Sequence, residues 1–206
     1  MKILAIDTAV GISVALHDGQ SVVAEATRVE HGVQGELTTV MIAELLAQAG
    51  WTPADLTDVV VGVGPGPYTG LRVGIVTATV FGHARGIQVH GICSLDSVGH
   101  DAGSECIVVT DARRKELYWA RYDGGRVDGP HVMVPAELAD AHPNARFVGP
   151  GAQLYPDVVA GEVMELRAGA LAELFATGTA QLVDVAPMYL RIPDAVAGTV
   201  RKKVGP

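Results

Sequence analysis

The segment of residues 62–74, GVGPGPYTGLRVG, has the glycine content of a phosphate-binding loop between an apolar strand and a long helix. A Walker loop needs a lysine and then a hydroxyl residue after its last glycine, to contact the terminal phosphates and Mg²⁺. Leucine and arginine follow Gly70 instead, and Pro65 and Pro67 have no N–H to donate to an anion. The pattern therefore favours a rigid strand-to-helix corner, with Thr69 as the expected N-cap.

The histidines do not have the spacing of a metal site on a helix. Two histidines four residues apart face one way on a helix and can chelate a metal. The seven here are His17, His31, His83, His90, His100, His131 and His142, and no two are three or four apart. Because H-E-x-x-H and G-x-S-x-G are also missing, neither a zinc peptidase nor a serine hydrolase of that type is supported.

Composition excludes several classes of protein. The chain has 206 residues, 49% hydrophobic and 18% charged, which suits one large or two small folded domains. A formal charge of −8 argues against a surface that mainly binds nucleic acid. Two cysteines without metal spacing indicate a reducing compartment, and no apolar run reaches 18 residues. We expect a cytoplasmic protein with no membrane contact.

Hydrophobic periodicity predicts an alternation of strands and helices. Strands are expected at 2–6, 12–16, 21–27, 59–63, 87–93, 107–110, 116–122 and 127–134, and helices at 34–49, from 70, near 95–100, at 135–141 and at 168–176. This order resembles two ribonuclease-H-like halves of an actin-like ATPase. The predicted fold class is α/β, with mixed sheets flanked by helices in subdomains 1–102 and 103–206.

The helix from residue 70 is unusual because small residues recur on it every four positions. They are Gly70, Gly74, Ala78, Gly82 and Gly86, a stripe along one face that another backbone can approach closely. The other faces are also apolar, and Arg72 and Arg85 carry the only charges. A helix that is apolar all round is usually buried on all sides. Either this chain or a partner must cover it.

Two aspartates stand where an actin-like ATPase would hold its nucleotide. Asp7 follows the first strand, but Thr8 and an alanine come next where such ATPases have a glycine that lets the backbone wrap the phosphates. Asp111 follows a later strand as a second candidate carboxylate. Gly149 and Gly151 are candidates for the remnant of an adenosine site. Alternatively, the aspartates cap turns; we predict a degenerate cleft rather than a working ATPase, since catalysis needs all the parts together.

Six segments appear in the order found in one bacterial family. They are Ile6-Asp7-Thr8-Ala9, Glu30-His31, the corner Gly64 to Gly74, Asp111-Ala112-Arg113 with Glu116 to Ala120, Gly149-Pro150-Gly151, and Pro187 to Arg191. Together they resemble the TsaB (YeaZ) family, which helps to make threonylcarbamoyladenosine in tRNA. The resemblance spans nearly the whole chain, with Pro67-Tyr68 as a mild departure where Ser-Phe is expected.

The resemblance implies a non-catalytic subunit that binds a TsaD-like paralogue, and that pairs with itself when alone. The paralogue would transfer the threonylcarbamoyl group to the adenosine next to the anticodon, a TsaE-like ATPase would join them, and tRNA would contact this chain only indirectly. No cofactor is expected here, and ATP and metal are expected on the partner subunits. The paralogue's metal-binding H-x-x-x-H pair corresponds here to Ser94 and Val98, so no metal site is expected.

Pairing in this family uses helices of the N-terminal half, which fits the two apolar helices. The expected interface residues are Leu37, Met41, Leu45, Gly70, Leu71, Val73, Gly74, Ala78, Phe81 and Gly82. The competing hypothesis is an autonomous enzyme, an actin-like ATPase or kinase or a glycoprotease-like peptidase. A kinase would need an intact phosphate loop and a catalytic aspartate, for which Asp7 and Asp111 are the candidates.

Overall fold

Apolar strands at the start of the chain build the first sheet of the structure, a computed structural model that describes residues 1–29 and 34–191. The strands are β1 (Ile3–Asp7), β2 (Ile12–His17), β3 (Val22–Arg28), β4 (Asp58–Gly62), β5 (Gln88–Ile92), β6 (Cys106–Asp111), β7 (Leu117–Tyr122), β8 (Arg126–Met133), β9 (Phe147–Val148), β10 (Gly161–Glu162) and β11 (Leu182–Val183). The helices are α1 (Gln34–Ala49), α2 (Tyr68–Arg85), α3 (Leu95–Ala102), α4 (Pro135–Ala141) and α5 (Ala168–Ala176), with 3₁₀ turns at Pro53–Asp55 and Pro150–Gln153.

The first sheet has the strand order β11-β5-β4-β1-β2-β3 and is mixed. β1 pairs with β2 in antiparallel register. β2 also pairs with β3 in antiparallel register, as the Asp18-Gly19 hairpin signal between them predicts. β1, β4 and β5 run parallel, because α1 and α2 are the crossover connections between them. The carboxyl ends of β1 and β4 therefore meet at one edge of the sheet, beside the corner.

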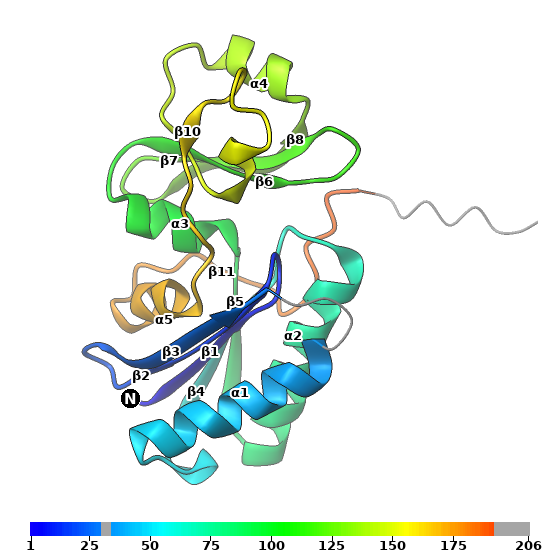
Figure 1. The fold of residues 1–206 in the computed structure, drawn as a ribbon. Helices are drawn as coiled ribbons and strands as arrows, with labels where there is room; N and C mark the ends of the chain where they lie inside the picture. The colour runs from blue at the N-terminus through cyan, green and yellow to red at the C-terminus, as the bar shows by residue number, and fades with distance from the viewer. Residues whose placement is uncertain (30–33, 192–206) are drawn as a thin grey trace, which may run out of the picture.

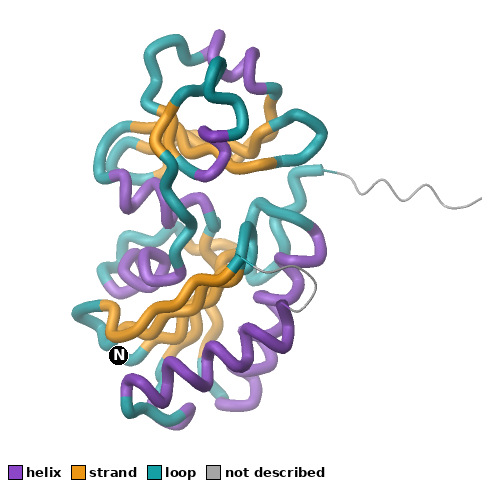
Figure 2. The backbone as a smooth tube through the Cα atoms, in the orientation of Figure 1, coloured by secondary structure: helices purple, strands orange, loops and turns teal. Residues whose placement is uncertain are grey.

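The first sheet and the helices that cover it form the first lobe of the molecule. Alternation of side chains along β1 divides the core of this lobe into two layers. Leu4 and Ile6 pack in one cluster with residues of α1 and α2, and Ile3 and Ala5 pack in another with residues of α5. Figure 2 shows the corresponding layers, with α1 and α2 on one face of the sheet and α5 on the other. The sheet is thus covered on both faces, which explains why its strands read as nearly continuous apolar runs.

The second lobe repeats this plan around a sheet of order β10-β9-β6-β7-β8 (Figure 1). β6, β7 and β8 are antiparallel, and β9 lies parallel to β6. One face packs against α3, where Val98 joins Val108 and Tyr122, and the opposite face packs against Leu138 of α4. The predicted α/β class with two mixed sheets flanked by helices is confirmed.

The chain returns to the first lobe after residue 167, which differs from the predicted subdomain 103–206. β11 pairs with β5, and Ala168, Leu171 and Ala172 of α5 pack on the first sheet. Small residues at the start of α5 permit this close approach to strands β1 and β2. Sequence order alone could not reveal the return, because β11 is only two residues long.

The helix α2 begins one residue earlier than its predicted N-cap. Tyr68 is its first residue, Pro67 occupies the cap position with φ of −60°, and no side chain caps the helix. The prediction of Thr69 as N-cap is wrong because the fixed φ of proline ends the corner before that residue. The helix closes at Gly86, whose left-handed φ of 66° suits glycine.

Candidate functional site

The corner brings the end of β1 against the start of α2. Two of the predicted cleft residues, Asp7 and Thr8, are buried there. Gly62 ends β4 directly beside Asp7, and a side chain at this glycine would collide with that carboxylate. The Gly64 N–H donates to the Ser94 hydroxyl at 3.0 Å, which fixes the corner to the residue before α3. Gly64 has a φ of 106°, a backbone conformation that a residue with a side chain rarely adopts.

Asp7 is a buried carboxylate with an incomplete set of partners. It is 3% exposed, and its Oδ1 accepts a hydrogen bond from the Ala9 N–H at 2.8 Å. Its Oδ2 is buried and has no hydrogen-bond partner among the described residues. Burial raises the pKa of Asp7 above its usual value, and the nearby Ser94 side chain and the Ala9 N–H oppose that rise.

Thr8 joins β1 to the first turns of α2. Its hydroxyl donates to the Gly70 carbonyl at 2.7 Å and accepts from the Gly74 N–H at 3.0 Å. Gly74 must be glycine here, because a Cβ would collide with the Thr8 side chain. The only proton of the hydroxyl is used in this bridge, so Thr8 has none left to donate to a phosphate.

The position where a phosphate-wrapping glycine would stand is closed by packing. Ala9 is 0% exposed, and a Cβ placed on Gly66 would lie 2.7 Å from the Ala9 carbonyl oxygen. The cavity beside Asp7 has a volume of about 10 Å³, the minimum that one water molecule requires. Among residues 1–29 and 34–191, the groups around Asp7 therefore do not fit a nucleoside triphosphate and its Mg²⁺.

Asp111, Gly149 and Gly151 make contacts within the second lobe, at the turn after β6 and against the backbone of β6. Asp111 accepts the Arg113 N–H at 2.7 Å and pairs with the Arg113 guanidinium at 3.1 Å, as a turn-capping aspartate does. Gly149 and Gly151 approach the backbone of Val109 so closely that a Cβ on either would lie 2.6–2.8 Å from it. All three positions have a structural role in the geometry observed.

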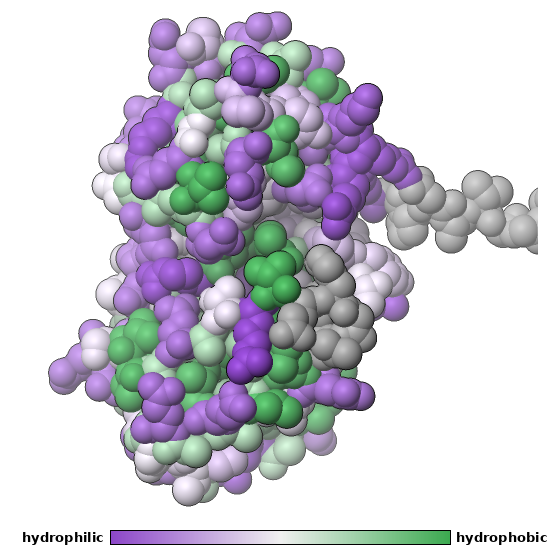
Figure 3. All heavy atoms as spheres, viewed as in Figure 1, coloured by the Kyte–Doolittle hydropathy of each residue, from purple (hydrophilic) through white to green (hydrophobic). Residues whose placement is uncertain are grey.

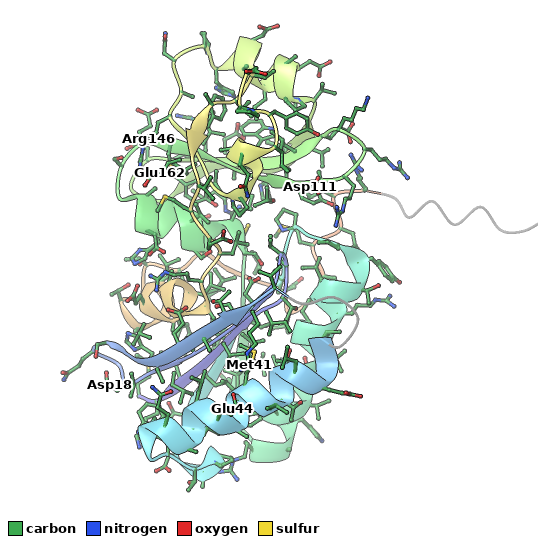
Figure 4. All side chains as sticks on the ribbon, viewed as in Figure 1. Asp18, Met41, Glu44, Asp111, Arg146 and Glu162 are labelled. Atoms are coloured by element: carbon green, nitrogen blue, oxygen red, sulfur yellow. The ribbon has the colours of Figure 1, made fainter. Side chains whose placement is uncertain are left out.

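The small-residue stripe lies on the inner face of α2, which corrects one predicted feature of the interface. Ala78 is 0% exposed in the core, and side chains on Gly74 and Gly82 would collide with Thr8 and Val89 of this same chain. The buried members of the predicted interface are Met41, Leu45, Gly70, Leu71, Gly74, Ala78 and Gly82, and the half-buried ones are Leu37, Val73 and Phe81. Figure 4 shows Met41 between α1 and the sheet. The close backbone approach that the stripe permits is made to the chain's own first sheet.

The outward faces of α1 and α2 carry exposed apolar residues that the predicted interface did not include. Val40 of α1 is 49% exposed, and Val76 and Val80 of α2 are 58% and 61% exposed. The two helices are neighbours: a Cβ on Gly35, near the start of α1, would lie 4.0 Å from Val73 of α2, and Arg85 at the end of α2 donates to the Pro53 carbonyl in the turn that follows α1. The spacing of four between Val76 and Val80 was the available signal, since it marks a second apolar face opposite the stripe.

A cavity of about 400 Å³, absent from the sequence-based predictions, lies between α3, α5 and the β7–β8 turn. Its wall includes Asp96, a buried carboxylate that accepts hydrogen bonds from the Tyr122 hydroxyl at 2.7 Å and the Arg126 Nε at 2.8 Å. Burial raises the pKa of Asp96, while the Arg126 charge lowers it. The cluster ties α3 to β7 and β8, since one residue comes from each of these elements.

Within residues 1–29 and 34–191, one group of side chains has the proximity of metal ligands: His100, Asp101 and Glu173. Both Asp101 oxygens accept hydrogen bonds from Arg167, and His100 pairs with Glu173 at 3.3 Å, so these groups already bind one another. The Glu30-His31 motif lies outside the described residues. None of the helices in the same two ranges has the length and hydrophobicity needed to cross a bilayer.

Substitution of Asp7 by asparagine is expected to raise the melting temperature at pH 7–8. The pKa of Asp7 is raised in the folded state. Its contribution to folding stability is therefore fully present below pH 3.8, the usual pKa, and is lost as the pH rises through the raised pKa of the folded protein. Asparagine removes the buried charge and keeps an acceptor for Ala9. Thermal unfolding at pH 4 and pH 8 tests this; a gain that is the same at both values would contradict the buried-charge explanation.

Comparison with known proteins places the chain in a family. Residues 23–160 match the family model described as "TsaD: tRNA N6-adenosine threonylcarbamoyltransferase". An uncharacterized protein of Mycobacterium tuberculosis is 42% identical over 202 residues, 94% of this chain and 93% of that protein. The tRNA threonylcarbamoyladenosine biosynthesis protein TsaB of Escherichia coli is 28% identical, covering 93% of this chain and 95% of TsaB.

The fold agrees with this assignment. A solved Pseudomonas aeruginosa protein, described as similar to peptidase YEAZ, superposes with a TM-score of 0.77 and 25% identity, over 92% of this chain and 99% of its own. These similarities cover nearly all of the chain rather than one lobe. The chain therefore belongs to the family of TsaD, the tRNA N6-adenosine threonylcarbamoyltransferase, and within that family to the TsaB (YeaZ) proteins.

Proposed function

We propose that this chain is a non-catalytic subunit in the synthesis of threonylcarbamoyladenosine in tRNA, and that it acts by binding a TsaD-type paralogue. The paralogue carries the catalytic site and transfers the threonylcarbamoyl group to the adenosine next to the anticodon. This chain stabilises the paralogue in its competent conformation by docking on it. The names of the relatives support the pathway, and the geometry of the cleft supports the non-catalytic role.

The observation that carries this proposal is that the predicted cleft residues make their contacts within this chain. The Thr8 hydroxyl bridges to α2, Ala9 is packed against Gly66, and Asp111 binds the turn that follows it. Phosphoryl transfer depends on positioned phosphates and metal, so the loss of these groups argues against an independent ATPase or kinase. We therefore propose that this chain requires no cofactor, and that ATP and metal bind to the partner subunits.

The outward face of α1 and α2 supports a protein partner. Val40, Val76 and Val80 are large apolar residues that remain exposed on neighbouring helices. Exposed apolar surface of this kind, rimmed by polar residues, is typical of protein–protein contacts. We propose that a TsaD-type paralogue covers this face, that a second copy of the chain covers it when the paralogue is absent, and that a TsaE-type ATPase joins the complex.

The acidic balance of the chain fits a subunit that leaves most of the tRNA contact to others. A formal charge of −8 opposes the approach of a polyanion, except where basic residues gather locally. We propose that the other subunits provide most of the tRNA-binding surface, in the cytoplasm, where tRNA is modified.

Size-exclusion chromatography with light scattering, combined with an assay for modified tRNA, tests this function. A defined complex with the TsaD-type paralogue is expected, with modification only when both proteins are present. If no complex forms and modification proceeds without this chain, the proposal is wrong. Mg²⁺-dependent ATP hydrolysis by the isolated chain, lost in Asp111→Ala, would instead favour an autonomous ATPase.

A further inference from the structure

The cavity of about 400 Å³ between the two lobes has no part in the proposed function, yet it has the size of a ligand site. Its wall is formed by α3, the end of α5, the turn between β7 and β8, and residues 177–181 before β11. Figure 1 shows α3 above α5 where the two lobes meet. Small-molecule sites in proteins typically have volumes of roughly 300–1,000 Å³. A ligand in this cavity would contact both lobes at once.

Glycines leave part of the cavity wall without side chains. A Cβ added to Gly103, Gly124 or Gly125 would meet no atom of the described residues within 4 Å. Gly103 and Gly124 have φ values of 62° and 68°, which explains why they are glycines. Gly125 has neither a left-handed φ nor a close neighbour, so its own surroundings do not require a glycine. The space beside these residues is therefore not filled by packing within the described part of the chain.

A fixed guanidinium supplies a hydrogen-bond donor to the cavity. The Arg126 Nε donates to Asp96 at 2.8 Å, and its Nη1 donates to the Gly129 carbonyl at 2.9 Å, so the group is held in place. The remaining nitrogen, Nη2, donates to no residue in the ranges 1–29 and 34–191, and it is not shut off from solvent. Because Arg126 lines the cavity, a ligand oxygen can accept from Nη2 while the contacts to Asp96 and Gly129 stay intact.

Gln181 and Leu174 add a hydrogen-bond acceptor and an apolar surface. The Gln181 Nε2 donates to the Arg126 carbonyl at 2.9 Å, which fixes the side-chain amide. Its oxygen, Oε1, accepts no hydrogen bond from the described residues and is available to an N–H of a ligand. Leu174 of α5 is half-buried in the same wall. A donor and an acceptor beside an apolar surface match a molecule that carries both a carbonyl and an N–H group.

The charges around the cavity are balanced, which selects against an ionic ligand. The Asp96 carboxylate is paired with the Arg126 guanidinium at 2.8 Å, and His100 is paired with Glu173 at 3.3 Å. An anion bound to Arg126 would also be repelled by the Asp96 carboxylate on the same guanidinium. A cation would meet the opposite conflict. An uncharged carbonyl accepts from Nη2 without either repulsion.

We propose that this cavity binds a small uncharged molecule with a cyclic amide group. Its carbonyl oxygen accepts from Arg126 Nη2, its N–H donates to Gln181 Oε1, and its apolar part contacts Leu174. At the level where the lobes meet, Figure 3 shows hydrophilic side chains between α3 and α5, which on this face favours a small molecule over an apolar protein contact. This binding role goes beyond the proposed function and does not depend on it.

Uridine is a suitable probe, because its uncharged ring has a carbonyl oxygen next to an N–H. Added at about 10 mM to the full chain, it should shift the backbone amide signals of Gly103 and Gly125 in ¹H–¹⁵N spectra, since this concentration detects affinities as weak as millimolar. Isotope-filtered nuclear Overhauser spectra should connect the uridine ring with the Leu174 methyl groups. Orotidine, which adds one carboxylate to the same ring, should bind at least about tenfold more weakly.

A pair of glutamine variants tests the predicted acceptor. Gln181→Leu should weaken uridine binding by about fivefold, because the ligand N–H loses its partner. The matched control Gln153→Leu, at an exposed glutamine in the 3₁₀ turn of the second lobe, should bind uridine like the unsubstituted chain. The inference is wrong if uridine leaves the Gly125 and Leu174 signals unchanged, if orotidine binds more tightly than uridine, or if the two variants bind uridine equally. Docking of the TsaD-type paralogue is measured separately, so none of these results decides the proposed function.

Discussion

Replacement of Ala78 by arginine is expected to unfold the first lobe. Ala78 is 0% exposed and lies in the cluster that joins α2 to β1 and β4, so the guanidinium would be buried without a partner. An unpaired buried charge costs at least about 5 kcal/mol, which is comparable with the total stability of a typical domain. Circular dichroism during heating should show no cooperative transition, or one lowered by more than about 15 °C.

The matched control is arginine at the neighbouring position 79. Thr79 is exposed on the same helix, so its substitution should change the free energy of unfolding by no more than about 0.5 kcal/mol. The two variants place the same charge at adjacent positions, 78 and 79, on different faces of α2. Equal melting temperatures for the two variants would mean that the stripe is not part of the core of this chain.

Arginine at both Val76 and Val80 is expected to abolish binding to the TsaD-type paralogue and leave the isolated chain folded. Both valines are more than half exposed, so the new charges remain in water in the free protein. In a complex that buries this face they would be desolvated, and affinity should fall on the order of a thousandfold. Light scattering after size exclusion, and isothermal titration with the paralogue, measure the loss; tRNA modification should fall with it.

A control at equally exposed valines of the second lobe separates a loss of docking from a general effect of charge. Val127 and Val163 are 50% and 47% exposed and lie outside α1 and α2. Val127→Arg with Val163→Arg should bind the paralogue normally. Should the Val76 and Val80 variant also bind normally, the paralogue must dock on another surface, and the outward face of α1 and α2 needs a different explanation.

The buried stripe and the exposed valines explain why one part of the sequence-based prediction needed correction. A helix with small residues on one face and valines on another has no single apolar side, so periodicity cannot tell which side meets its own sheet. The structure answers this with two contacts, Gly74 against Thr8 and Gly82 against Val89. The first contact joins residues 66 positions apart, and the second joins α2 to the next strand, β5, so neither can be read from the periodicity of the helix alone.

For the cleft residues, in contrast to the faces of α2, the prediction came from a short stretch of sequence. The alanine after Thr8 and the prolines of the corner already predicted that a nucleotide would fit poorly. The structure adds how each group is used: Thr8 bridges to α2, and Asp111 holds the turn that begins at Arg113. This prediction needs only the residue types within a short motif, because those types decide which phosphate and metal ligands are available; the absence of ATP binding stays a prediction.

The sequence by itself predicted the strands β1 to β8 and the five helices in their order, and the departures from a phosphate-binding loop; the resemblance of that order to actin-like ATPases predicted the α/β class with two mixed sheets. These follow from local periodicity, turn residues and the identity of a few side chains. Only the tertiary structure decided which face of α2 is buried, that α5 and β11 return to the first sheet, and that Asp96, Arg126 and Gln181 line one cavity. Each of these depends on contacts between segments far apart in the chain, whose energies are set by packing that no single segment specifies.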